Sequence, residues 1–315
     1  MFWVIRHSFN IIDVMECNMN TSKGLLMVSC AGICWATTGL FGTFLFREGL
    51  DPVNVASTRT VLAAIIFLAF LLIAHPRKLL VSPKQITMLA IGGLAGIAIF
   101  NIFYLSTISV SGMSTAVVLL YTAPAFTVIL SRIFLGEPFS RLKITALVTA
   151  FTGVVLVVEA FDFKVLIHDP GAVLLGLGAG FFFALLSVFG KYLTGSTHRL
   201  TTSFYLLFTG ALILALIRPP WLALIEIWSS PALLPALIAL VVISTFLSHF
   251  LYIYGLSHLE AGKASIAVAI EPPAAIFLAY LFLGERLTPL QYGGVTLVLA
   301  AVLMLRLPPK NGTKP

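Results

Sequence analysis

Phe134-Leu135-Gly136-Glu137 and Phe282-Leu283-Gly284-Glu285, two copies of one tetrapeptide, decide how the 315-residue chain is organised. The copies lie 148 residues apart, and the same offset places Pro124 on Pro272 and Leu142 on Leu290. Chance matches between two apolar segments would not keep one ungapped offset along a whole half of the chain. The sequence therefore predicts an internal duplication, with one repeat over residues 24–159 and the other over residues 171–306.

The composition excludes a soluble globular protein. Hydrophobic residues make up 59% of the chain and charged residues only 10%, and the mean hydropathy is +1.06. A soluble domain carries roughly a quarter charged residues. The net charge of +7 does not indicate a nucleic-acid partner, because the basic residues are scattered among the loops and form no basic stripe.

Ten apolar segments, interrupted by charged residues, proline or glycine, predict ten membrane spans. Each is close to the roughly 20 residues that a helix needs to cross a bilayer. The expected fold is an all-α membrane protein of ten transmembrane helices. The predicted spans are 24–45, 52–74, 85–108, 112–134, 143–159, 171–191, 201–217, 231–256, 262–283 and 289–306.

The distribution of Lys and Arg predicts the orientation of these spans. If the N-terminus is cytoplasmic, fourteen basic residues lie on the cytoplasmic side and four in the outer loops. Basic residues resist translocation, so we expect both termini to be cytoplasmic. Five spans per repeat is an odd number, which makes the repeats inverted relative to each other. Inverted repeats are typical of transporters.

The two ends of the chain lie outside the predicted repeats. Residues 1–23 contain Arg6, Asp13 and Glu16, so they lack the uninterrupted apolar core of a signal peptide. We expect a cytoplasmic leader here, with the functional chain starting near Met19. The alternative is a short amphipathic cytoplasmic helix. Residues 307–315 are expected to form a cytoplasmic tail.

Several short motifs support a family assignment through their order and duplication. Tyr121-Thr-Ala-Pro124 precedes the first tetrapeptide, and Glu271-Pro272 precedes the second. Arg59 lies in Ala-Ser-Thr-Arg-Thr, early in the second span, and Trp35 ends Gly-Ile-Cys-Trp in the first. Over residues 24–306 the chain resembles the EamA-type transporters of the drug/metabolite transporter (DMT) superfamily.

That resemblance implies a ten-helix fold whose substrate cavity is lined mainly by spans 1, 3, 4, 6, 8 and 9. It also implies export of amino acids, related metabolites or drugs by secondary transport. Family membership does not fix the substrate, because one fold hosts many functions.

Two charged residues, Arg59 and Glu271, lie deep inside predicted spans. A charge within the bilayer is costly unless it is paired or hydrated, so both are candidate substrate-binding residues. Arg59 would attract a substrate carboxylate; the alternative is a fixed tie between helices. Glu271 would receive a substrate ammonium or carry a proton; the alternative is a structural glutamate bonded to the neighbouring backbone.

Prolines adjoin the candidate site in both repeats. Proline removes a backbone donor and frees a carbonyl one turn earlier, so we expect helix kinks at Pro124, Pro272 and Pro273. The remaining candidates are polar or aromatic residues near the middle of spans, and ordinary packing is the alternative for each. These substrate-binding candidates are Trp35, Asn101, Tyr104, Tyr121, His249, Tyr252 and Ser265.

The function predicted from these features is secondary active export of small metabolites. An amino acid or similar zwitterion is the preferred substrate, because one acid and one base lie deep in the bilayer. The alternatives are an exporter of neutral or aromatic compounds or drugs, and, outside transport, a membrane sensor or an intramembrane enzyme. No HExxH motif or phosphate-binding GxxxxGK[ST] loop occurs.

We therefore expect neither an enzyme nor a cofactor or metal site. The expected partners are a small-molecule substrate and the lipid bilayer of the cell membrane. Coupling to protons and exchange against a counter-substrate both stay open, as does the oligomeric state.

Overall fold

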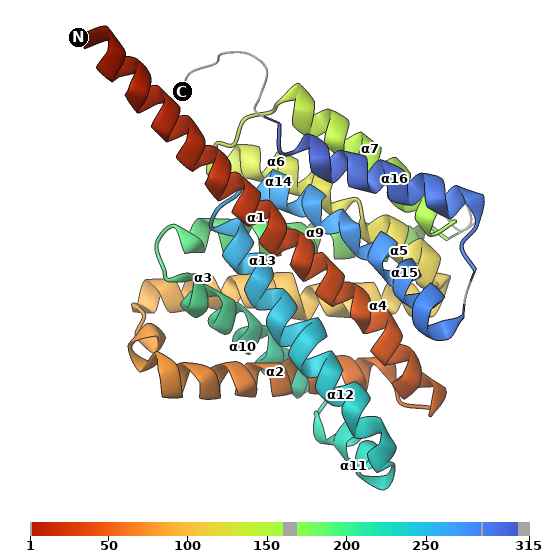
Figure 1. Ribbon diagram of the computed structural model, residues 1–315. Coiled ribbons are helices and arrows are strands. Elements are labelled where there is room, and N and C mark those ends of the chain that lie inside the picture. Colours follow the sequence, from red (N-terminus) through yellow and green to blue (C-terminus); the bar gives the residue numbers. More distant parts are fainter. Residues whose placement is uncertain (1, 160–168, 285, 308–315) are drawn as a thin grey trace.

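The computed structural model describes residues 2–159, 169–284 and 286–307, with side chains from residue 21 onward. Over these residues the chain is all-helical, and its helices pack lengthwise into one bundle (Figure 1). The first half contains α1 (Phe2–Arg47), α2 (Pro52–Ala74), α3 (Pro83–Gly93), α4 (Phe100–Ser111), α5 (Met113–Leu120), α6 (Ala123–Leu135) and α7 (Arg141–Val157).

The second half contains α9 (Pro170–Thr194), α10 (Arg199–Ile217), α11 (Trp221–Ser229), α12 (Leu234–Val241), α13 (Ser248–Leu256), α14 (Ala261–Ala267), α15 (Glu271–Leu283) and α16 (Pro289–Met304). Side chains fix several helix starts. Asp51, Ser82, Ser140, Asp169 and Thr288 each accept hydrogen bonds from backbone N–H groups in the first turn that follows.

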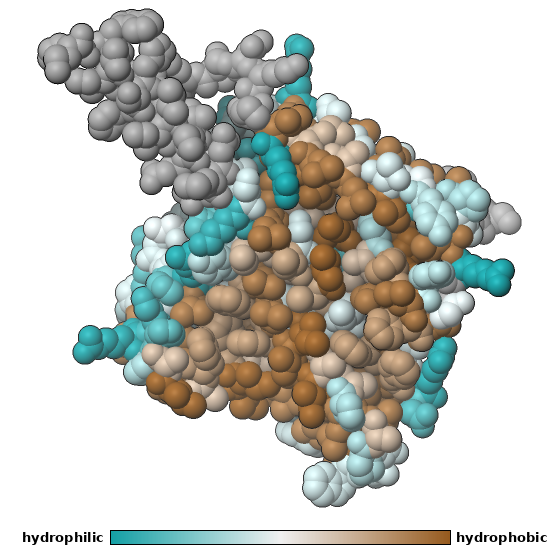
Figure 2. Space-filling view, viewed as in Figure 1, coloured by the Kyte–Doolittle hydropathy of each residue, from teal (hydrophilic) through white to brown (hydrophobic). Residues whose placement is uncertain are grey.

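Eight helical stretches in the described part of the chain are long and apolar enough to cross a membrane. They correspond to predicted spans one to four and six to nine, so the chain is a multi-pass membrane protein. The helices at predicted spans five and ten are shorter, since α7 has 17 residues and α16 has 16. The count of ten spans therefore stays a prediction. Figure 2 shows an apolar surface across the middle of one face, with hydrophilic side chains near its rim.

The backbone repeats itself with the offset found in the sequence. A π-helical turn over Leu94–Ile99 recurs 148 residues later over Val242–Leu247. The bounds of α6 and α15 are related by the same offset. Each of these two helices ends on a left-handed glycine, Gly136 with φ 69° and Gly284 with φ 72°. Two equivalent halves therefore share local geometry as well as sequence.

The two halves meet along several helix pairs. α7 and α16 lie side by side at one edge of the bundle, and α1 crosses it beside α13 and α15 (Figure 1). Gly153 of α7 faces Gly294 of α16 so closely that a Cβ added to either would lie within 3 Å of the other's carbonyl oxygen. Small residues permit such close approach of helices.

Some expectations lie outside the described residues. The backbone of α1 is one helix from Phe2, and its apolar span runs Thr21–Arg47. The expected start near Met19 is not tested by this helix. The tail over 308–315 and Glu285 of the second tetrapeptide also lie outside the described part.

Candidate functional site

Arg59 projects from α2 toward the second repeat. Its Nη1 donates a hydrogen bond to Thr245 Oγ1 at 3.0 Å. Thr245 belongs to the π-helical turn Val242–Leu247, and its hydroxyl donates in turn to Leu240 O at 2.9 Å, five residues earlier. A π-turn widens the helix and often marks a functional site. Here the turn positions the hydroxyl that receives the guanidinium.

Glu271 is the first residue of α15, where the sequence breaks the helix. A 3₁₀ turn over Val268–Ile270 precedes it, and Pro272 and Pro273 occupy the first turn after it. Tyr121 OH donates a hydrogen bond to Glu271 Oε2 at 3.0 Å. A carboxylate at a helix N-terminus is also favoured by the helix dipole.

The predicted kink positions lie at starts of helical segments. Pro124 is in the first turn of α6, after a break at Tyr121 and Thr122 that separates α6 from α5. Pro272 and Pro273 hold the equivalent place in α15. Proline fits the first turn because the N–H that it lacks has no partner there.

The two deep charges belong to different repeats and lie within electrostatic range of each other. Arg59, Tyr104 and Glu271 interact mutually, and Tyr121 also interacts with Glu271. Arg59, Tyr104 and Glu271 are nevertheless only half-buried, so part of each side chain is accessible deep in the bundle. A hydrated or ligand-filled site reduces the cost of such charges. The arrangement offers one cationic and one anionic group to a small molecule.

Aromatic rings form a layer near these charges. Trp35 packs on Tyr252 with ring centroids 5.2 Å apart, and on Phe183 at 5.9 Å. Phe100 stacks on Tyr104 at 5.7 Å and contacts Phe183 at 5.3 Å. Trp35, Phe100 and Tyr104 are half-buried, whereas Tyr252 is fully buried. The half-buried faces can contact a substrate, while Tyr252 supports them from behind.

Four predicted site residues are packed into the protein instead. Tyr252 OH shares a hydrogen bond with Ser187, Ser265 accepts one from Thr127 at 3.1 Å, and Asn101 Nδ2 donates to a backbone carbonyl one turn earlier. His249 is buried, and its Nε2 is thus a buried polar atom without a hydrogen-bond partner in the described part of the chain.

Sequence reasoning missed the hydrogen-bond partner of Arg59, whereas Tyr121, the partner of Glu271, was among the predicted site residues. Thr245 was not singled out as a partner of Arg59, and a second hydroxyl pair joins Thr37 to Ser244 at 2.6 Å beside the same turn. A weak signal was present in the run Ile243-Ser-Thr-Phe246, which puts two hydroxyls inside an apolar span.

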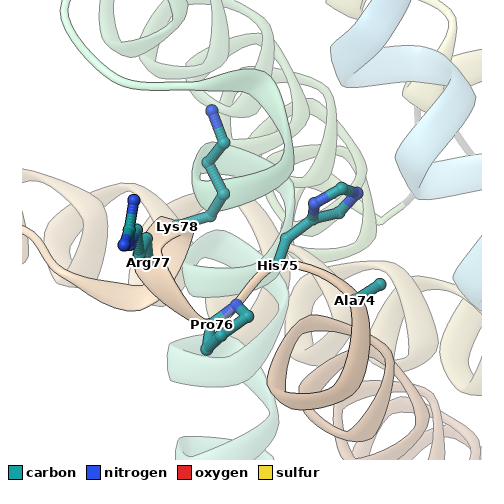
Figure 3. A pocket seen from close by; sticks show the side chains of 5 residues that line it. All are labelled: Ala74, His75, Pro76, Arg77 and Lys78. Carbon is teal, nitrogen blue, oxygen red and sulfur yellow. The ribbon is translucent and has the colours of Figure 1, made fainter.

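A shallow hollow elsewhere on the surface has different chemistry. Its volume is about 280 Å³, and it lies where α2 ends, far from Arg59 along that helix. Figure 3 shows His75, Arg77 and Lys78 around it. With two cations and no acid in its lining, the hollow does not belong to the site of Arg59 and Glu271.

Comparison with known proteins identifies two matching stretches. Residues 22–159 and 170–307 each match the EamA-like transporter family. One solved protein chain has the same fold, with a TM-score of 0.75 at 16% identity, covering 90% of this chain and 96% of the other.

Similar proteins are named as transporters. An uncharacterized transporter of Archaeoglobus fulgidus is 26% identical over 262 residues, which cover 81% of this chain and 89% of the relative. An uncharacterized inner membrane transporter of Salmonella typhimurium, YicL, is 26% identical and covers 91% and 96%. A probable terminal-alkyne amino-acid exporter of Streptantibioticus cattleyicolor is 23% identical and covers 91% and 94%. With family matches in both halves, the chain belongs to the EamA-like transporter family.

Proposed function

We propose that this chain is a secondary active exporter of amino acids or related small zwitterions. The observation that carries the proposal is that Arg59 and Glu271, two partly accessible charges from different repeats, lie within electrostatic range of each other. The carboxylate of a zwitterion would bind the guanidinium, and its ammonium would bind Glu271. The amino-acid exporter among the relatives supports this substrate class.

The proposed mechanism is alternating access between two inverted five-helix repeats. In this arrangement ten spans cross the cell membrane and both termini are cytoplasmic. A site shared between repeats is exposed to either side when one repeat rocks against the other. Energy for export would come from a proton gradient through Glu271 or from exchange against a second substrate.

A second candidate is the export of neutral or aromatic compounds. The observation that favours it is the aromatic layer of Trp35, Phe100 and Tyr104 beside the charges. A flat apolar compound would stack on these rings and make no use of Arg59. Charge requirements therefore separate the two candidates.

Reconstitution into liposomes tests both candidates. The transport of radiolabelled amino acids is measured with and without a pH gradient. The wild type is compared with the variants Arg59→Met and Glu271→Gln. Hydrogen bonds to charged groups contribute about 1.5–3 kcal/mol, so we expect each variant to lose about tenfold or more in transport efficiency. Glu226→Gln is the matched control, because Glu226 is an exposed carboxylate on α11.

Three outcomes separate the proposals. Saturable amino-acid flux that falls in both variants supports the zwitterion exporter. Transport of aromatic compounds that both variants retain supports the second candidate. Absence of saturable flux for any small metabolite would contradict export altogether. Loss of the pH-gradient effect in Glu271→Gln alone would indicate proton coupling through this carboxylate.

A further inference from the structure

Two equivalent half-helices differ sharply in their burial. In α14 every residue except Lys263 is buried. In α5, which occupies the equivalent place in the first repeat, only Ala116 and Leu119 are buried, and Met113 is 52% exposed. The two halves share backbone geometry but not packing. We call the end of the bundle at α14, which packing encloses, the closed end, and the end at α5, where the helix surface is exposed, the open end.

A cluster of charges holds the closed end together. Glu137, which follows α6, accepts hydrogen bonds from the backbone N–H of Ala261 at 2.6 Å and of Gly262 at 3.2 Å. Lys143 of α7 is only 2% exposed and pairs with Glu137 at 3.6 Å and with Glu260. These contacts tie the first repeat to the start of α14 in the second.

At the equivalent positions of the open end only one of the three charges recurs, since Glu137 corresponds to Glu285. The offset of 148 residues carries Lys143 onto Gln291 and Glu260 onto Gly112, both of which are uncharged. Gln291 Nε2 donates instead to the Val157 carbonyl at 3.2 Å, between α16 and α7. The charges that tie the repeats at the closed end therefore have no equivalent pair at the open end.

We propose that Glu137, Lys143 and Glu260 form an ionic gate that keeps one end of the transport path shut. The inference rests on the proposed function, since a gate requires a path. On the proposed orientation the closed end faces the cytoplasm, so the structure is the outward-open state. A contact that exists in one state only shifts the equilibrium toward that state. Loading of substrate from the cytoplasm then requires the three side chains to separate.

Cysteine labelling tests the gate without any substrate. In a background with Cys17, Cys30 and Cys34 changed to alanine, one probe is Ala264→Cys, at a buried position of α14. The other is Ser114→Cys, at an exposed position of α5. The rates of reaction of each probe with a polar maleimide are measured in detergent.

The gate variants are then compared in both probe backgrounds. Lys143→Met removes the central cation, and Lys143→Arg retains the charge. The matched control is Lys263→Met, because Lys263 pairs with Glu260 within its own segment at 3.2 Å and does not bridge the repeats. If Lys143→Met fails to fold, Glu260→Gln replaces it, since Glu260 is 32% exposed and more tolerant of change.

We expect Lys143→Met to raise the labelling rate at position 264 by about tenfold or more and to lower the rate at position 114. Lys143→Arg and Lys263→Met should stay close to the wild-type rates. Unchanged rates at both positions in Lys143→Met would overturn the gate. A parallel rise at both positions would also overturn it, since that pattern reports general loosening of the fold.

Failure of the gate is distinguishable from failure of the proposed function. If labelling shifts as expected while no amino acid is transported, the gate stands and the substrate class is wrong. If amino acids are transported while labelling does not respond to Lys143→Met, the function stands and the gate is wrong.

Discussion

Neighbouring glycines in α16 predict opposite responses to the same substitution. A Cβ added at Gly294 would lie 2.6 Å from Gly153 O and 2.8 Å from Val157 N, whereas one added at Gly293 meets no atom within 4 Å. Both atoms near Gly294 belong to the backbone of α7, so they cannot rotate away. Ordinary contact begins at 3.4 Å, which requires the helices to separate by about 0.8 Å. Gly294→Ala must therefore disturb the α7 and α16 pair.

Whether each substitution stabilises the protein depends on the balance between overpacking and helix propensity. Overpacking costs about 1–3 kcal/mol, while alanine is favoured over glycine inside a helix by about 1 kcal/mol. We expect Gly294→Ala to lower the free energy of unfolding by up to about 2 kcal/mol after the propensity gain is included. Gly293→Ala should raise it by about 0.5–1 kcal/mol.

The free energy of unfolding of both variants is measured in mild detergent micelles. A denaturing detergent is titrated in, and circular dichroism monitors the loss of helix. Gly153→Ala should resemble Gly294→Ala, and the double variant should lose less than the sum, because both substitutions disturb one contact. Equal stability of Gly293→Ala and Gly294→Ala would refute the close approach of these helices.

Two further predictions concern polar groups. Tyr121→Phe removes the hydroxyl that donates a hydrogen bond to Glu271 at 3.0 Å. Because a hydrogen bond to a charged group contributes about 1.5–3 kcal/mol, the half-saturation concentration for transport should rise about tenfold. An unchanged half-saturation concentration would contradict a role of this hydroxyl in substrate binding. For Glu260, burial favours protonation, but pairing with Lys143 and Lys263 outweighs it and holds the pKa below its ordinary value of 4.5. The stability that this carboxylate contributes is thus present above pH 4.5 and is lost as the pH falls through the lowered pKa. The melting temperature of the wild type should therefore fall on acidification, and that of Glu260→Gln should fall less. An equal dependence of the melting temperature on pH in both proteins would count against the pairing.

Uninterrupted apolar segments and one offset predicted much of the scaffold. Eight of the predicted spans correspond to membrane-length helices, and the offset of 148 residues recurs in the bounds of α6 and α15. These features follow from local composition and from duplication, both of which are visible in a single sequence. The shorter α7 and α16 show where composition alone fails to fix a span's length.

The contacts of the site were less predictable, because they join residues far apart in the chain. The depth of Arg59 and Glu271 marked them as candidates, but their partners Thr245 and Tyr121 lie 186 and 150 residues away. Lys143 is the first residue of the predicted span 143–159, and nothing in the sequence indicates that it is almost fully buried and paired with Glu260 of the other repeat. Only the packing of two repeats brings these groups together.

The two π-helical turns are an irregular feature of the backbone that both repeats contain. A turn of this kind contains one residue more than the α-helix it interrupts, and the extra residue occurs in both halves at matching positions, Leu94–Ile99 and Val242–Leu247. The two repeats therefore share this irregularity of the backbone. The repeats do not share their deep charges, since Leu207 stands at the counterpart of Arg59 and Ala123 at that of Glu271. The two halves therefore keep one scaffold while their charges differ, which gives the interior of the bundle a basic side chain from the first repeat and an acidic one from the second.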